Sequence, residues 1–320
     1  MRMRKYYKKT RRDRRGILLL ALLVFFLFPY IVSNFSDMEK QKLEKKDVPG
    51  EIFVLQKKSW GEVKIPLEEY LEGMLAATIP AEYHTETLKA QSIILRSFCM
   101  SKVEKRDGSK VILDDDIKEM YFSRPECQKL WGEEWEAKQQ KIRQAVKETK
   151  GVIAISEETI LSLPFSRISN GFTRDISEYV VHKEDYAFMK TVSCPEDEQA
   201  EEYLQYKEYS VREFQKRLQK ILEKKKAPGK MILYRDSAGY VKEVILGDDR
   251  IDGEKVRNVL GLVSSCFYVE KIDNVIQIRT KGIGHGFGFS QYSADKMAQS
   301  GCDYTYLLNY FFQNISLEKI

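Results

Sequence analysis

Cysteine and histidine are scarce in this chain, and the few that are present do not form a metal-binding pattern. Its 320 residues include 5 cysteines and 3 histidines. No two cysteines have Cys-x-x-Cys spacing and no Cys/His cluster exists, so neither a metal site nor another cofactor is expected. An odd number of cysteines also excludes complete intramolecular pairing, which leaves buried free thiols, alone or with one disulfide. The cysteines are Cys99, Cys127, Cys194, Cys266 and Cys302.

Proline is also rare, with 8 residues, whereas apolar residues make up 43% of the chain and charged residues 32%. This composition excludes disordered, collagen-like and mucin-like chains. The length suffices for one large domain or two modest ones with a sizeable core.

Most of the chain lacks an excess of basic residues, although its net charge is +5. Residues 2–15 contain nine Lys or Arg and one acid, Asp13, and the remaining chain holds 44 basic and 47 acidic residues. The positive charge therefore belongs to a short tail, and no nucleic-acid partner is expected.

A long uncharged run follows this tail. Residues 17–32 read ILLLALLVFFLFPYIV and contain no charge. A buried core helix of this length would normally carry a polar stripe. A cleaved signal peptide would end in a small-x-small site, which is poor here, although the segment ending at Ser33 does not exclude one. We therefore predict a retained signal anchor that crosses the cell membrane once, with the N-terminus in the cytoplasm and the C-terminal domain outside.

The expected organisation follows from this anchor. A basic cytoplasmic tail at 1–15 precedes a transmembrane helix at 16–33, a Lys/Glu-rich linker at 34–50 and one extracytoplasmic domain at 51–317.

Helical and strand-like periods alternate irregularly along that domain, and no internal repeat is visible. Because strands and helices do not follow a regular βα alternation, we expect an α+β fold rather than a doubly wound sheet. Thr85 is the expected N-cap of the second helix, and 107–126 is expected to be a loop. The predicted helices are 67–77, 86–104, 135–150, 211–225, 253–261 and 290–312. The predicted strands are two within 51–66, hairpins around Glu157-Glu158 and over 231–246, and single strands at 266–270 and 275–280.

Three long motifs occur in series. Residues 65–98 read IPLEEYLEGMLAATIPAEYHTETLKAQSIILRSF, residues 253–270 read GEKVRNVLGLVSSCFYVE, and residues 282–317 begin GIGHGFGFSQYSADKMAQSG. A weaker match is SNGFTRD at 169–175. In this order they resemble the stage II sporulation protein D family, also called the SpoIID/LytB family. The combination is specific, and it covers about 51–317.

This resemblance implies a fold, a function and partners. It implies one SpoIID/LytB-type domain that acts on peptidoglycan glycan strands as a lytic transglycosylase during engulfment of the forespore. The family acts beside an amidase, stage II sporulation protein P, and a membrane protein, stage II sporulation protein M. Other members enhance amidases without cutting glycan. Three functions therefore stay open: a transglycosylase using another acid, a non-catalytic glycan binder or amidase enhancer, and a scaffold of the engulfment machinery.

The catalytic position departs from the family pattern. A lytic transglycosylase needs one carboxyl group that serves first as acid and then as base, because the sugar's own hydroxyl replaces water. The family supplies it as the Glu of a Glu-Met-Pro triplet, which reads Thr78-Ile79-Pro80 here. Glu82 is the candidate substitute acid, whereas Glu86 matches a different family Glu and is expected to be structural. Catalysis is therefore expected to be impaired or absent.

The expected substrate-binding residues come from the helix after this turn and from the glycine-rich motif. Gln91 and Arg96 are 140° apart around a helix, so one should face the groove and the other brace the fold. Arg96 is the expected contact to sugar or wall carboxylates, and a buried salt bridge is its alternative role. The glycines allow close backbone approach to a ligand, and the helix that starts near Ser290 offers free amides. The residues assigned to the groove are Gln91, Arg96, His285, Gly286, Ser290 and Gln291.

Overall fold

The computed structural model describes residues 52–58, 61–106, 109–117, 120–180, 186–222 and 231–320. The predicted tail, anchor and linker lie outside these residues. Within the described ranges, no helix combines the length and apolar character that a membrane crossing requires.

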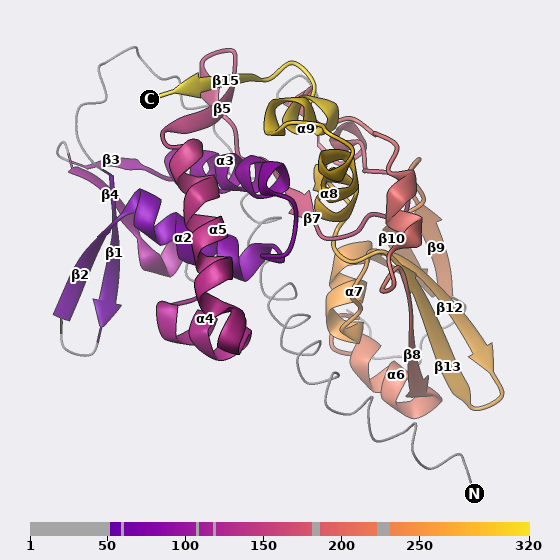
Figure 1. The fold of residues 1–320 in the computed structure, drawn as a ribbon. Coiled ribbons are helices and arrows are strands. Elements are labelled where there is room, and N and C mark those ends of the chain that lie inside the picture. Colours follow the sequence, from indigo (N-terminus) through magenta and orange to yellow (C-terminus); the bar gives the residue numbers. More distant parts are fainter. Residues whose placement is uncertain (1–51, 59–60, 107–108, 118–119, 181–185, 223–230) are drawn as a thin grey trace, which may run out of the picture.

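The first half of the chain builds a helical layer beside a small sheet (Figure 1). The sheet order is β2-β1-β4-β3, with β1 and β4 parallel and the other pairs antiparallel. Its strands are β1 (Phe53–Lys58), β2 (Gly61–Pro66), β3 (Glu104–Arg106) and β4 (Ser109–Leu113). The helices are α2 (Leu67–Thr78), α3 (Thr85–Ser101), α4 (Arg124–Trp131) and α5 (Trp135–Glu148).

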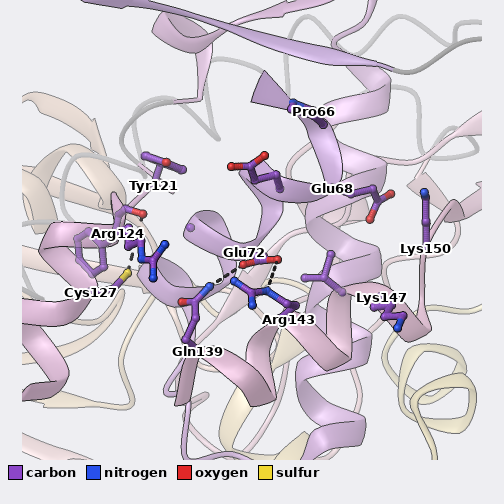
Figure 2. A pocket seen from close by; sticks show the side chains of 14 residues that line it. Pro66, Glu68, Glu72, Tyr121, Arg124, Cys127, Gln139, Arg143, Lys147 and Lys150 are labelled. Atoms are coloured by element: carbon purple, nitrogen blue, oxygen red, sulfur yellow. Dashed lines mark hydrogen bonds and ion pairs between the residues drawn. The ribbon is translucent and has the colours of Figure 1, made fainter. Parts of the chain in front are cut away.

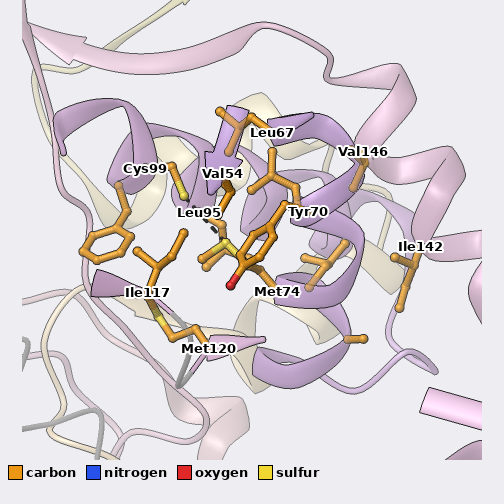
Figure 3. Close-up of a cluster of buried hydrophobic side chains, with 14 of the residues drawn as sticks. Val54, Leu67, Tyr70, Met74, Leu95, Cys99, Ile117, Met120, Ile142 and Val146 are labelled. Carbon is orange, nitrogen blue, oxygen red and sulfur yellow. Dashed lines mark hydrogen bonds between the residues drawn. The ribbon is translucent and has the colours of Figure 1, made fainter. Parts of the chain in front are cut away.

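Helix α3 is central to the domain because it is buried on nearly every side. One side contributes Leu88 and Leu95 to a core shared with α2 and α5, which Figure 3 shows around Tyr70 and Met74. The other side contributes Ile93 to a second core with α8 (Gln291–Gln299) and α9 (Tyr304–Phe311). A helix without an exposed stripe is expected only inside a fold.

In the part of the chain that the structure describes, the second half adds four small sheets and, besides α8 and α9, two further α-helices (Figure 1). β14 (Phe289–Ser290) pairs in parallel with β7 (Phe165–Ser166), and β5 (Val152–Ser156) pairs with β6 (Thr159–Ile160) and β15 (Ser316–Lys319). A third core lies under α6 (Val211–Leu218) and α7 (Gly253–Leu260). The two three-stranded sheets of this half are β8 (Leu204–Ser210) with β12 (Cys266–Ile272) and β13 (Val275–Lys281), and β9 (Met231–Arg235) with β10 (Val241–Leu246) and β11 (Asp249–Asp252).

This mixture of helices and mainly antiparallel sheets confirms the α+β prediction. The hairpin at Glu157-Glu158 is also confirmed, because both residues have the positive φ, 48° and 68°, that a tight hairpin turn requires. All five cysteines are free, and four of them are buried.

Three local predictions were wrong. The N-cap of α3 is His84, whose side chain accepts the amide of Glu86 at 3.3 Å, so Thr85 is the first helical residue. The expected loop at 107–126 contains β4 and the start of α4, which begins with a capping box of Ser123 and Glu126. The expected helix 290–312 is two helices, because Gly301 has a φ of 101° that ends α8.

Candidate functional site

Thr78 is the last residue of α2, and its side chain is turned back onto the helix. Its Oγ1 donates a hydrogen bond to the carbonyl of Met74 at 2.8 Å. Ile79 is extended with a φ of −143°, and Pro80 follows, so the helix cannot continue. The hydroxyl is thus engaged within its own helix, in the bond that helical Ser and Thr side chains form to the carbonyl four residues earlier. The Thr78 carbonyl, at the same end, is free to accept from another element.

That element is α8, through a pair of buried glutamines. Gln291 Nε2 donates to the Thr78 carbonyl at 2.9 Å and to Gln91 Oε1 at 3.1 Å. Gln91 is fully buried and Gln291 is 1% exposed. The fold therefore brings together three predicted site residues from two distant motifs. Since both amides are buried, the pair fastens α3 and α8 to the end of α2 and presents no surface to a ligand.

Arg96 has the role that was expected of Gln91. Its guanidinium is 1% exposed and forms two hydrogen bonds with the carboxylate of Glu68, at 2.8 and 2.7 Å. It also donates to the carbonyls of Val146 and Val152, at 3.3 and 3.1 Å. Both residues of the pair are therefore buried and hold the fold together, so the expectation that Arg96 contacts a ligand was wrong and Arg96 is a brace.

His285 lies inside the domain, 5% exposed. Its Nδ1 accepts the amide of Phe287 at 3.0 Å and lies 3.3 Å from Ser166 Oγ. Burial, together with the neighbouring guanidinium groups of Arg257 and Arg174, lowers the pKa of the imidazole to about 3. The side chain is therefore neutral and holds the glycine-rich loop in shape.

The glycines of this loop make room for protein atoms. Gly286 has a φ of 82°, and a Cβ built there would lie 2.2 Å from the ring of Tyr240. Its amide donates to Ser166 Oγ at 2.9 Å. A Cβ on Gly288 would lie 2.2 Å from the carbonyl of Pro164. Close approach is thus confirmed as the reason for the glycines, but what approaches is the chain itself.

Ser290 serves a buried carboxylate. Its Oγ donates to Asp197 at 2.6 Å, and Ser293 Oγ and the amide of Ser169 donate to the same group at 3.0 and 2.7 Å. Burial raises the pKa of Asp197, while these hydrogen bonds oppose the rise. Ser290 stands at the N-cap position of α8, but its side chain forms no capping hydrogen bond.

The accessible part of the site is the turn after α2 and its neighbours. We call Thr78, Glu82, Tyr83, Lys141 and Arg167 the Thr78 surface, because each side chain is half-buried or exposed. Lys141 Nζ donates to the Glu82 carbonyl at 3.0 Å. Burial raises the pKa of the Tyr83 phenol, and the nearby guanidinium of Arg167 opposes this rise. Tyr83 lies within the first motif but was not assigned a role there, and Lys141 and Arg167 come from segments that no motif covers.

Glu82 does not have the properties of a general acid. Its side chain is 60% exposed and forms an ion pair with Lys138. Burial of part of the group raises its pKa, but the hydrogen bond from Lys138 and other local contacts outweigh this and hold the pKa of Glu82 below its ordinary value. A general acid needs the opposite shift, so that it is protonated near neutral pH.

The other carboxylates around the turn are engaged as acceptors. Asp295 accepts the amide of His84 and the side chain of Gln299, each at 2.5 Å. Glu202 accepts from Arg167 at 2.9 Å. Glu86 accepts the amide of Tyr304 at 3.0 Å and pairs with Lys89, as expected of a structural residue. The described residues near Thr78 therefore offer charged and aromatic contacts without a visible proton donor for a leaving oxygen.

The fold and this site define a class of protein: an α+β domain in which a glycine-rich loop and a glutamine pair connect α8 to the C-terminal end of α2. A family model described as stage II sporulation protein matches residues 56–155. The chain is 31% identical over 280 residues to stage II sporulation protein D of Bacillus amyloliquefaciens, covering 86% of this chain and 80% of the relative. It is 32% identical over 262 residues to stage II sporulation protein D of Bacillus subtilis (strain 168), covering 80% and 75%.

An uncharacterized protein of Brachyspira hyodysenteriae is 26% identical over 269 residues, covering 79% of this chain and 67% of that protein. The identities and coverage of the Bacillus relatives establish the family. The chain belongs to the stage II sporulation protein D family and is a SpoIID-type sporulation protein.

Proposed function

We propose that this chain binds peptidoglycan glycan strands at the Thr78 surface and has little or no transglycosylase activity of its own. The observation that carries the proposal is the state of Thr78. Its hydroxyl is committed to the Met74 carbonyl, while Gln291, paired with Gln91, holds the helix end in place through the Thr78 carbonyl. The residues that hold the end of α2 in place are thus present, whereas position 78 carries no carboxyl group.

The chemistry supports this division between binding and cleavage. A hydroxyl group cannot act as a proton donor near neutral pH, and loss of a general acid typically costs about 10²–10⁴-fold in rate. A Glu at the last residue of α2 would lie at the negative end of the helix dipole, which raises a carboxyl pKa and suits an acid. Thr78 instead directs its hydroxyl to the Met74 carbonyl of the same helix. Glu82, beside it, is held ionised by Lys138.

The proposal is tested by release of anhydro-muropeptides from purified glycan strands. The full-length chain is compared with Thr78→Glu, Glu82→Gln and, as a matched control, Thr78→Gln, which has nearly the same size as Glu but no acid. We expect binding without product from the wild type, partial activity from Thr78→Glu and none from Thr78→Gln. Partial activity is expected because a misplacement of about 1 Å can cost 10²-fold.

Strong cleavage by the wild type would contradict the proposal. Loss of that cleavage in Glu82→Gln would show that the acid has moved to Glu82. Cleavage that survives in Glu82→Gln would place the acid elsewhere.

A second candidate function is a scaffold or amidase enhancer that uses no glycan contact. It is favoured by the burial of Gln91, His285 and Gln291, since their polar groups serve the fold. The expected partners are an amidase of the stage II sporulation protein P type and a membrane protein of the stage II sporulation protein M type. Stimulation of the amidase by a chain that does not bind glycan would select this function.

The proposed location is the cell membrane, with the sporulation domain outside. The basis is the uncharged run at 17–32 after a tail of nine basic residues. An outward-facing domain is the arrangement in which the Thr78 surface can reach the cell wall.

A further inference from the structure

A pocket of about 530 Å³ lies between α2, α4 and α5. This volume is within the range of small-molecule sites. The pocket uses the first two turns of α2, whereas Thr78 ends that helix, and no residue of the Thr78 surface lines it. It is therefore separate from the site described above, although both use α2.

Opposite charges line the two long sides of the pocket. Glu68, Glu69 and Glu72 come from α2, and Arg143 and Lys147 come from α5. Lys150, just beyond α5, and Arg124, on α4, complete the charged lining. Figure 2 shows Lys147 and Lys150 at one end and Arg124 with Tyr121 at the other, with Glu72 between them.

Two of the three carboxylates already have a cation. Glu68 is held by Arg96 through two hydrogen bonds, and Glu72 accepts from Arg143 at 3.2 Å and from Gln139 at 2.6 Å. The Glu72–Arg143 ion pair therefore lies in the middle of the pocket, between its two ends (Figure 2).

The remaining charges are unbalanced. Among the described residues, the side chains of Glu69, Lys147 and Lys150 form no ion pair or hydrogen bond, and the guanidinium of Arg124 lies over the face of Trp135, with its Cζ 5.5 Å from the ring centroid. The pocket therefore offers three cations and one carboxylate to a ligand. A ligand that matches it carries several carboxylates and one amine.

The apolar part of the lining favours an organic ligand over a simple anion. The ring of Tyr121 is stacked on Tyr70 with centroids 4.2 Å apart, so this wall is fixed. Gly73 permits the close packing, because a Cβ there would lie 2.3 Å from the Tyr121 ring. Phe122 extends the same wall.

We propose that this pocket binds a short acidic peptide that carries one free amine. Its carboxylates contact Lys147, Lys150 and Arg124, and its amine contacts Glu69. The stem peptides that branch from peptidoglycan glycan have this chemistry, and that identification rests on the proposed function. The pocket then recognises peptide while the Thr78 surface recognises sugar.

The test is titration of the full-length chain with the tripeptide N-acetyl-L-Ala-γ-D-Glu-meso-diaminopimelate, followed by calorimetry or NMR. The acetyl group blocks the alanine amine, so the diaminopimelate amine is the one free amine of this probe. Exposed ion pairs contribute up to about 1 kcal/mol each, so removing one lysine should weaken binding by about threefold to fivefold. Lys147→Ala combined with Lys150→Ala should weaken it by about tenfold or more. The matched control is Lys129→Ala combined with Lys216→Ala, which removes two exposed lysines outside the pocket and should leave binding unchanged.

The amine is tested separately. Acetylating the diaminopimelate amine should weaken binding to the wild type, and Glu69→Gln should remove that difference. Equal binding of the tripeptide by the two double variants would overturn the proposal. Binding of inorganic phosphate as tight as that of the tripeptide would also overturn it, since the pocket would then be a general anion site.

Peptide-free glycan strands separate this inference from the proposed function. Loss of tripeptide binding in the Lys147/Lys150 variant with unchanged glycan binding supports both. Tripeptide binding that depends on these lysines, without any glycan binding, supports the pocket and contradicts the proposed function.

Discussion

Replacing His285 by Asn should change how the stability of this protein depends on pH. The imidazole is buried, and its pKa is lowered from 6.5 to about 3, first by burial and then by Arg257 and Arg174. The Asn Oδ1 stands where Nδ1 stands in histidine, so it can still accept the amide of Phe287, which is 3.0 Å from Nδ1 in the wild type. The variant removes the titration and keeps this hydrogen bond.

The sign and size of the effect follow from proton linkage. The folded state keeps His285 neutral down to about pH 3, whereas the unfolded chain binds a proton near pH 6.5. The stabilisation is therefore fully present above pH 6.5 and is lost as the pH falls toward the folded-state pKa. At pH 5 the wild type should have lost about 2 kcal/mol through this group alone.

The assay is urea unfolding of the full-length chain at about pH 7 and about pH 5. Other groups titrate in both proteins. The informative quantity is therefore the change in the free energy of unfolding between the two pH values, compared between wild type and variant. The wild type should lose about 2 kcal/mol more than His285→Asn. His84→Asn, at an exposed helix cap, is the control and should follow the wild type. An equal loss in wild type and His285→Asn would refute the argument that burial keeps this imidazole neutral.

Two further predictions concern the brace and the topology. Arg96→Met should lower the free energy of unfolding by about 3 kcal/mol, because it leaves the Glu68 carboxylate without its buried partner. The control is Arg143→Met, at a guanidinium that is 61% exposed, which should lower the same free energy by less than about 1 kcal/mol. Similar losses for the two variants in urea unfolding would contradict the assignment of Arg96 as a brace. Protease added to intact protoplasts should digest residues 51–320 and spare the basic tail, and protection of the domain would overturn the predicted orientation.

Local chemistry in the sequence was sufficient for much of the secondary structure. The apolar period from Leu67 to Leu75 predicted α2, and a helix end needs only the proline that follows. The turn at Glu157-Glu158 was likewise evident from its flanking strands. Helix α4 was missed although its capping box of Ser123 and Glu126 is also a local signal. A short polar helix has only a weak apolar period, so the period did not reveal it.

The family was also determined by sequence alone, because it depends on the identity of residues in motifs along the chain. The absence of a catalytic acid at Thr78 stays a prediction from the same motifs. What each polar residue does was decided by tertiary structure. A helical period shows that Gln91 and Arg96 face different directions, but not which direction meets Glu68, 28 residues away from Arg96 in the chain. In the same way, the motif glycines predict close approach, and only the fold reveals that Tyr240 fills the space above Gly286. Burial is a property of the assembled chain, since it depends on contacts between segments that no local pattern relates.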